Sequence, residues 1–309
     1  MILNDYSFTR YLAAKKSVDD RALNREVWEV LAGSLPNASH DKPIKVLEIG
    51  AGIGTMLERM LEWDLFRYAE YTALDSHPEN VDQARQRISD WTQRKGLQVS
   101  GIDGDMLIAG QGLEINMRLE GDDLFDFIAG QKKQGAWDLL IAHAFLDLVD
   151  LPSTLELLFP LCNDGGLFYF TINYDGLTIL EPIIDRDLDR QIIALYHSTM
   201  DRRTRDDLPS GDSQTGRHLF THITNLGGQI LAMGSSDWVV FPGPDGYPQD
   251  EAYFLHFIID TIYQALINHP ELDTQRFEDW ISQRHAQIEG QELVYIAHQL
   301  DFVGTCPPK

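Results

Sequence analysis

A run of apolar residues that ends in three alternate glycines constrains the fold of this chain more than any other feature. Residues 44–49 are typical of a buried strand, and Gly50, Gly52 and Gly54 follow directly. Glycine has no Cβ and tolerates positive φ, so such a turn lets a ligand approach the main chain. The next apolar residues predict a helix near 54–66, whose free N–H groups can bind acceptor atoms. The segment therefore predicts a ligand-binding strand, turn and helix.

The spacing of the glycines bears on which ligand the turn binds. A dinucleotide-binding turn has the spacing G-x-G-x-x-G and holds pyrophosphate. Here the third glycine comes one residue early, and Thr55 takes the expected glycine place. Glu48 stands two residues before the first glycine. A carboxylate at that point disfavours pyrophosphate and suits a ligand with an ammonium group.

Strand and helix patterns alternate along the next part of the chain. We expect strands at 44–49, 71–75, 97–102, 137–142 and 167–172, with helices near 54–66, 78–94, 122–131 and 152–161. Such alternation predicts parallel βαβ units with helices on both faces of the sheet. Later we expect helices at 217–226, 250–268 and 273–289, a sixth strand at 229–233 or 238–241, and a last strand at 292–303. The predicted fold class is α/β with a doubly wound, mostly parallel sheet.

Three segments stand outside this regular order. Residues 1–43 are predicted to form a helical N-terminal cap, and 44–309 a single α/β domain with insertions at about 174–217 and 244–290. We expect the insertions to form a lid over the carboxyl edge of the sheet, where ligands bind in open α/β folds. The 309 residues, 43% of them apolar, suffice to bury the core of such a domain.

Charge and cysteine content exclude several functions. The chain has 25 basic and 48 acidic residues, a formal net charge of −23. A field of that sign repels phosphate backbones and anionic membranes, and there is no transmembrane-length apolar run, so we expect neither nucleic acid nor membrane as partner. The two cysteines, Cys162 and Cys306, exclude a disulfide framework. With no signal-peptide pattern at the start, we expect a cytoplasmic location.

The glycine turn resembles motif I of the class I S-adenosylmethionine-dependent methyltransferases, acid-x-Gly-x-Gly-x-Gly, at Glu48, Gly50, Gly52 and Gly54. The resemblance implies a Rossmann-like sheet of seven strands, the last antiparallel and inserted between strands five and six. It also implies S-adenosylmethionine as the cofactor. The long helical stretch between the last two strands departs from the short hairpin usual in the family.

The same resemblance implies which residues hold the cofactor. Asp75 ends the second expected strand and would accept the ribose hydroxyls, with Ser76 beside it. Asp105 follows the third expected strand and would accept from the adenine amino group while Met106 packs on the ring. The complete predicted cofactor set is Glu48, Gly50, Ala51, Gly52, Gly54, Asp75, Ser76, Asp105, Met106 and His143.

Residues 137–147 resemble motif IV, where in this family the strand end lies beside the methyl group. The chain has His143-Ala144-Phe145-Leu146 there instead of the Asn/Asp-Pro-Pro-Tyr/Phe of many amino and nucleobase methyltransferases. This departure argues against adenine or glutamine amide acceptors and favours the small-molecule branch. His143 is the candidate general base because an imidazole titrates near neutrality; a hydrogen bond to a backbone carbonyl beside the cofactor is the alternative. The candidate substrate residues are Tyr11, Arg21, Phe145, Asp147, Asn173, Tyr174, Arg217 and His218.

The expected function is methyl transfer from S-adenosylmethionine to an oxygen, nitrogen or carbon atom of a small molecule. Three alternatives stay open: a non-catalytic cofactor-binding or interaction protein, an aminopropyltransferase on the same fold, and a nicotinamide-dependent oxidoreductase. The glycine spacing and Glu48 disfavour the last, and no paired-Asp motif supports the second. Apart from His143 and His218, the histidines show no H-x-x-x-H or H-E-x-x-H spacing among themselves, so we expect no metal. A homodimer is left open.

Overall fold

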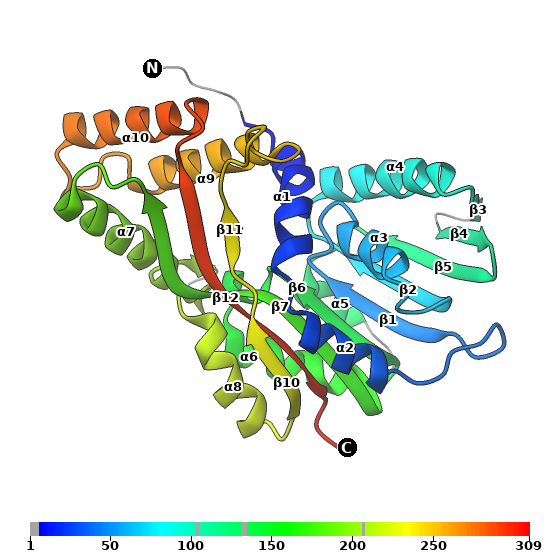
Figure 1. Ribbon diagram of the computed structural model, residues 1–309. Coiled ribbons are helices and arrows are strands. Elements are labelled where there is room, and N and C mark those ends of the chain that lie inside the picture. The colour runs from blue at the N-terminus through cyan, green and yellow to red at the C-terminus, as the bar shows by residue number, and fades with distance from the viewer. Residues whose placement is uncertain (1–5, 103–104, 131–134, 206–207) are drawn as a thin grey trace.

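The computed structural model describes residues 6–102, 105–130, 135–205 and 208–309, which form a central sheet flanked by helices (Figure 1). The helices are α1 (Phe8–Ala22), α2 (Arg25–Ser34), α3 (Thr55–Glu62), α4 (Pro78–Arg94), α5 (Leu124–Gly130), α6 (Leu151–Leu158), α7 (Arg186–Asp201), α8 (Thr215–Asn225), α9 (Glu251–Leu266) and α10 (Thr274–Glu289), with short 3₁₀ helices η1 (Leu146–Leu148) and η2 (Phe159–Leu161). The strands are β1 (Ile44–Ile49), β2 (Tyr68–Leu74), β3 (Gln98–Ile102), β4 (Asp105–Gly110), β5 (Leu113–Glu120), β6 (Trp137–His143), β7 (Cys162–Glu181), β8 (Thr204–Arg205), β9 (Leu208–Pro209), β10 (Gln229–Ser235), β11 (Trp238–Val240) and β12 (Val294–Thr305).

The order of strands confirms the predicted fold class. The main sheet runs β10-β12-β7-β6-β1-β2-β5-β4-β3, and β11 pairs with β12. Strands β5, β2, β1, β6 and β7 are parallel, whereas β12 is antiparallel and lies between β7 and β10. This is the Rossmann-like order expected from the sequence. The described part of this sheet has ten strands instead of the expected seven, because β3, β4 and β11 extend it.

The third parallel strand is not where the sequence analysis put it. Residues 98–102 form β3, the edge of an antiparallel hairpin with β4, and the parallel neighbour of β2 is β5. A two-residue turn joins β4 to β5, with φ of +54° at Gln111 and +76° at Gly112. Positive φ at both central residues is typical of the hairpin turns that match strand twist. Gly112 therefore belongs to the hairpin turn between β4 and β5.

The two faces of the sheet bury alternate residues of the same strands. On β1, Val46 packs with α2, α3 and α4, whereas its neighbour Leu47 packs with α5, α6 and α8. On β7, Tyr169 belongs to the first face and Phe168 to the second. Parallel strands buried on both faces read as continuous apolar runs, which explains why these strands were predictable.

A third core lies beyond the carboxyl edge of the parallel strands. The long strand β7 continues to Glu181 and pairs there with the start of β12, which also carries β11. Residues of α1, α7, α9 and α10 pack against this extension. Figure 1 shows α1 lying between α9 on one side and helices α3 and α4 on the other. Both predicted insertions, 174–217 and 244–290, contribute to this core.

Two further features qualify the sequence expectations. Cys162 and Cys306 form a single disulfide that joins the start of β7 to the residue after β12, a pairing the sequence analysis did not predict. None of the helices in the described ranges is long and apolar enough to cross a membrane.

Candidate functional site

The glycine turn makes a tight approach between β1 and α3. Gly50, Gly52 and Gly54 all have positive φ, at +65°, +54° and +78°. A Cβ at Gly50 would lie 2.5 Å from Cδ2 of Phe145, which follows β6. Both the backbone conformation and the available space therefore require glycine at position 50.

Asp75 fixes the turn to the end of β2. Its carboxylate accepts hydrogen bonds from the backbone N–H of Gly52 at 2.8 Å and of His77 at 2.9 Å. The side-chain amide of Asn80 donates a third at 3.0 Å. Asp75 is mostly buried, and it faces the same cavity as the glycine turn. A preorganised carboxylate at this point can accept further hydrogen bonds from ligand hydroxyls.

Glu48 is a buried acid on the floor of this cavity. The hydroxyl of Tyr71 on β2 donates to its Oε2 atom at 2.5 Å. Burial raises the pKa of Glu48 to about 8, and the Tyr71 hydrogen bond opposes that shift only in part. Glu48 is therefore largely protonated at pH 7 until a cation reaches it.

Asp19 of α1 gathers three donors above the end of β6. It accepts from Nζ of Lys15 at 2.8 Å, from Nε2 of His143 at 2.9 Å and from the indole of Trp238 at 2.9 Å. Burial alone would raise the pKa of Asp19, but Lys15 and His143 outweigh it and hold this pKa well below its usual range. Asp19 is thus an ionised acceptor, so Nε2 of His143 carries a proton.

His143 has both ring nitrogens engaged. Its Nδ1 atom lies 2.8 Å from the hydroxyl of Thr171, which can donate to it. Burial, followed by the charge of Lys15, lowers the pKa of His143 to about 4 although Asp19 opposes this. The imidazole is therefore neutral and has no free lone pair facing the cavity. This geometry disfavours the predicted role as general base and assigns His143 to holding α1 on the sheet.

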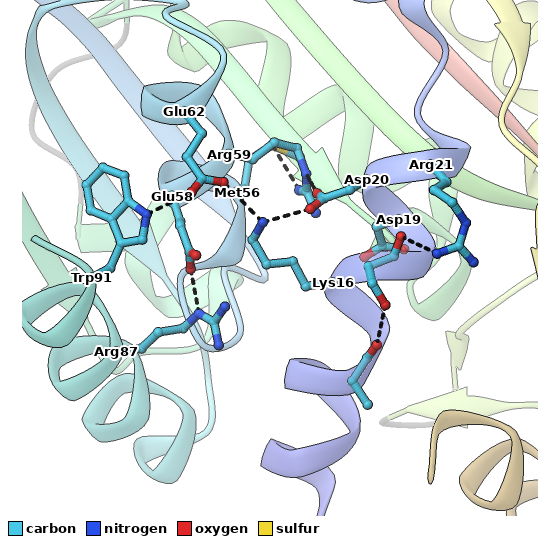
Figure 2. A network of polar contacts seen from close by, with 12 residues as sticks. Lys16, Asp19, Asp20, Arg21, Met56, Glu58, Arg59, Glu62, Arg87 and Trp91 are labelled. Carbon is cyan, nitrogen blue, oxygen red and sulfur yellow. Dashed lines mark hydrogen bonds and ion pairs between the residues drawn. The ribbon is translucent and has the colours of Figure 1, made fainter. Parts of the chain in front are cut away.

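Polar contacts on both sides of α1 hold the helix in place. Figure 2 shows Asp20 between Lys16 and Arg59. Oδ2 of Asp20 lies 2.7 Å from Nζ of Lys16, and Oδ1 lies 2.5 Å from Nε of Arg59 on α3. The Arg59 side chain is fully buried. Toward α9, Arg21 donates to Glu251 through Nη2 at 2.8 Å. These ion pairs join α3 and α9 through α1, which thereby covers the glycine turn.

One cavity of about 500 Å³ brings these groups together. Its first half lies at the carboxyl edge of β1, β2, β5 and β6 and is lined by Glu48, Gly50, Ala51, Gly52, Asp75, Ser76, Asn80, Asp122, Asp123, Phe125 and His143. Its second half lies among α1, η1, β7, α7 and β12 and is lined by Tyr11, Phe145, Asp147, Tyr174, Thr178, Tyr196, Arg203, Trp238, Tyr295 and Gln299. The volume is within the range of small-molecule sites.

Most predicted site residues lie on this cavity. Of the predicted cofactor set, the lining includes Glu48, Gly50, Ala51, Gly52, Asp75, Ser76 and His143, while Gly54 is the N-cap of α3 next to it. Of the predicted substrate set, the lining includes Tyr11, Phe145, Asp147 and Tyr174.

Asp105 and Met106, which were predicted to bind adenine, lie away from the cavity. Asp105 begins β4 and pairs with Arg118 at 3.1 Å, and Met106 is buried under the first face of the sheet. Neither lines the cavity, because β4 lies one strand farther out in the sheet than β5. The residues that follow the true third parallel strand, β5, are 121–125, and Asp122 and Phe125 among them do line it.

Four predicted substrate residues also lie off the cavity, each held by another partner. Arg21 is bound to Glu251, and the Asn173 side chain donates to the backbone of Leu300 at 2.8 Å. Arg217 pairs with Asp175 at 2.8 Å, and Nδ1 of His218 contacts Asp212. Their polar groups are thus used to fasten the insertions and the sheet extension.

The sequence analysis did not assign Asp19, Asp122, Tyr196, Trp238 or Tyr295 to the site. Only the acidic pair after β5 had a local signal, because Gly121-Asp122-Asp123 follows a strand with clear alternation. The others come from helices and strands that only tertiary packing brings together. Lys15 of α1 also lines the cavity.

The strand order defines a Rossmann-like fold with a cavity at the carboxyl edge of its sheet, and comparison with known families says which kind. Residues 47–168 match the family described as methyltransferase domain. The matched residues thus form a methyltransferase domain, which agrees with a class I S-adenosylmethionine-dependent methyltransferase and with S-adenosylmethionine as the cofactor. The match ends within β7. It therefore includes the residues named above for the first half of the cavity and ends before both insertions. No curated protein matches the sequence.

Several solved structures are similar to this chain at low identity. The chain bound by the Haloferax volcanii Trm112 methyltransferase activator has a TM-score of 0.45 and 14% identity, covering 98% of this chain and 96% of that one. Geranyl diphosphate C-methyltransferase from Streptomyces coelicolor A3(2) gives 0.44 and 8%, covering 90% and 78%. Phosphoethanolamine N-methyltransferase 2 from Haemonchus contortus gives 0.43 and 9%, covering 97% and 57%. At these scores the resemblances carry no argument about the acceptor.

Proposed function

We propose that this methyltransferase acts on a small molecule held in the second half of the cavity, and methylates an oxygen, nitrogen or carbon atom there. The observation that supports this is the continuity of the cavity from the glycine turn to a compartment lined by both insertions. A protein that only bound the cofactor would not need this second compartment. Its modest size favours a small acceptor over a polymer.

The residues of the first half fit S-adenosylmethionine. Asp75 would accept the ribose hydroxyls, and Asp122 and Phe125 would take the adenine contacts that the sequence analysis gave to Asp105 and Met106. Glu48 would face the ammonium group of the amino acid part. Gly50 has no room for a Cβ, so the backbone itself forms the wall there. The cofactor supplies an activated methyl group, so the protein contributes mainly alignment and exclusion of water.

Lys15 is the residue we assign to the carboxylate of the cofactor. Its Nζ atom is buried on the cavity wall, 2.8 Å from Asp19 and 5.4 Å from the ring centre of Trp238. An ammonium group has three donors, and Asp19 uses one of them. His143 then acts as a positioning residue, because it orients Asp19 and through it Lys15.

Calorimetric titration with S-adenosylhomocysteine tests the assignment of the first half. We expect Asp75→Asn to weaken binding by about tenfold or more, since buried polar groups of the ligand lose a charged acceptor. Asp105→Asn is the matched control and should leave the affinity unchanged. Equal loss in both variants, or no loss in Asp75→Asn, would contradict the assignment. Production of S-adenosylhomocysteine with candidate acceptors then tests turnover.

A further inference from the structure

The second half of the cavity contains a carboxylate with one unpaired oxygen atom. Asp147 lies in η1, directly after the end of β6, and lines the cavity. Its Oδ1 atom is buried and accepts no hydrogen bond from any described residue. A buried acceptor left unpaired is costly, which makes this atom a candidate ligand contact.

Tyrosine side chains from four separate elements line the same compartment. Tyr11 comes from α1, Tyr174 from β7, Tyr196 from α7 and Tyr295 from β12. Burial raises the pKa of Tyr196 to about 12 and holds the pKa of Tyr295 well above its usual value, so these phenols stay neutral at pH 7. Neutral aromatic rings present a negative π-face to a cation.

Acidic residues outnumber basic ones on the wall of the cavity as a whole. They are Asp147 in the second half, and Asp19, Glu48, Asp75, Asp122 and Asp123 in the rest of the cavity, where Glu48 is protonated until a cation reaches it. Two Lys or Arg residues stand among the described residues of this wall, and Asp19 neutralises Lys15 at 2.8 Å. The other, Arg203, is exposed, so solvent screens its charge near Asp147. The net charge of −23 would also draw cations from solution.

We propose that the methyl acceptor is a small aliphatic amine, bound as its ammonium ion between Asp147 and the rings of Tyr11, Tyr174, Tyr196 and Tyr295. This inference rests on the proposed function and specifies its substrate class. A neutral acceptor would leave Oδ1 of Asp147 without a charged partner, and a carboxylate acceptor would meet a like charge there. We refer to Asp147 and these four tyrosines as the amine cage.

Asp147 also suits the proton transfer that such an acceptor requires. An ammonium nitrogen has no lone pair, so one proton must first pass from it to the Asp147 carboxylate or to water. The freed lone pair then forms the N–C bond as the C–S bond breaks, and the sulfur keeps that electron pair. Burial raises the pKa of Asp147, opposed by the nearby charges of Arg203 and Lys15 and supported by Asp212. The raised pKa of the Asp147 carboxyl group lies closer to the pKa of an ammonium group, which eases the transfer of the proton.

Binding of three probes of similar size and different charge tests the amine cage. Tetramethylammonium, tert-butanol and pivalate would each be titrated into the protein saturated with S-adenosylhomocysteine. We expect tetramethylammonium to bind about tenfold more tightly than tert-butanol, and pivalate to bind least. Stronger binding of pivalate or tert-butanol than of tetramethylammonium, or no binding of tetramethylammonium, would overturn the proposal.

Single substitutions test separately how the Asp147 carboxylate and the tyrosine rings contribute to tetramethylammonium binding. Asp147→Asn should weaken tetramethylammonium binding about tenfold. Asp164 is an exposed acid near the start of β7, so Asp164→Asn should leave this binding unchanged. Tyr196→Leu should weaken it about fivefold, whereas Tyr196→Phe keeps the ring and should retain it. Unchanged binding in both Asp147→Asn and Tyr196→Leu would also overturn the cage.

Binding of S-adenosylhomocysteine distinguishes failure of the proposed function from failure of the proposed amine acceptor. Normal binding of it in a protein that ignores tetramethylammonium leaves the proposed function standing and rejects the amine acceptor. Failure to bind it rejects the proposed cofactor site. In that case the three probes, titrated into the free protein, would still decide whether the cage selects a cation.

Discussion

The Nε2 atom of His143 lies 2.9 Å from Oδ2 of Asp19, although 124 positions separate the two residues in sequence. Asp19 belongs to the N-terminal helix α1, and His143 ends the strand β6 at the centre of the sheet. The contact therefore closes the helical cap over the sheet edge. Because Trp238 and Lys15 donate to the same carboxylate, α1, β6 and β11 meet at one ionised group.

The neutral state of His143 predicts a pH-dependent contribution to stability. Its folded pKa is about 4, below the value of about 6.5 expected in the unfolded chain. Between these values the unfolded chain takes up a proton that the folded protein does not. The advantage of wild type over His143→Gln in free energy of unfolding should therefore shrink by roughly 2–3 kcal/mol as pH falls from 7 to 4.

Urea unfolding at several pH values measures this contribution, and comparison with the variant cancels the contributions of other groups. His40→Gln, which changes an exposed histidine, is the control and should follow wild type. An advantage that grew at low pH would mean that His143 is protonated on Asp19 in the folded protein.

The raised pKa of Glu48 predicts that cofactor binding releases a proton. At pH 7 the buried acid is mostly protonated, and an ammonium group beside it favours the ionised form. The affinity for S-adenosylhomocysteine should then rise by up to about tenfold per pH unit between pH 6 and 7.5. Calorimetry in two buffers of different ionisation enthalpy counts the released protons. Glu48→Gln should bind more weakly with no such dependence; an identical dependence in this variant would reject the role of Glu48.

The ion pairs of α1 predict that the cap and the cofactor site are coupled. Asp20→Asn removes the negative partner of the fully buried Arg59 and should cost about 2 kcal/mol of stability, since Asp20 is itself partly exposed. The loosened α1 should exchange its amide hydrogens faster and bind S-adenosylhomocysteine less tightly. Glu26→Gln, an exposed acid on α2, is the matched control. Unchanged exchange in α1 would show that Asp20 does not hold it.

The parts of the site that the sequence predicted are those with a local signal. The glycine turn, Glu48 and Asp75 stand at fixed distances from buried strands, so their place at the carboxyl edge follows from the parallel fold. A strand was expected at 97–102 and none at 113–120, so the residues after 102 were assigned to the adenine contact, whereas β5 is the strand whose carboxyl end lies at the cavity.

The remaining site residues depend on contacts between distant segments. Asp19 reaches the cavity because α1 packs against α3 and α9, and Tyr196 and Tyr295 reach it because both insertions fold onto the extended β7 and β12. Helical periodicity predicts which face of a helix is buried, but not what covers it. The sequence also does not show which charged residues pair within the chain. Arg217 was expected to contact a ligand, but it pairs with Asp175.

The central claim is that the cavity holds an adenosine joined to an amino acid and not a pyrophosphate-linked dinucleotide. Its most direct measurement is calorimetric titration of the wild-type protein with S-adenosylhomocysteine and, separately, with NADH at the same concentrations. The account predicts saturable binding of S-adenosylhomocysteine at one site for each chain and no binding of NADH. Saturable binding of NADH without binding of S-adenosylhomocysteine would contradict it.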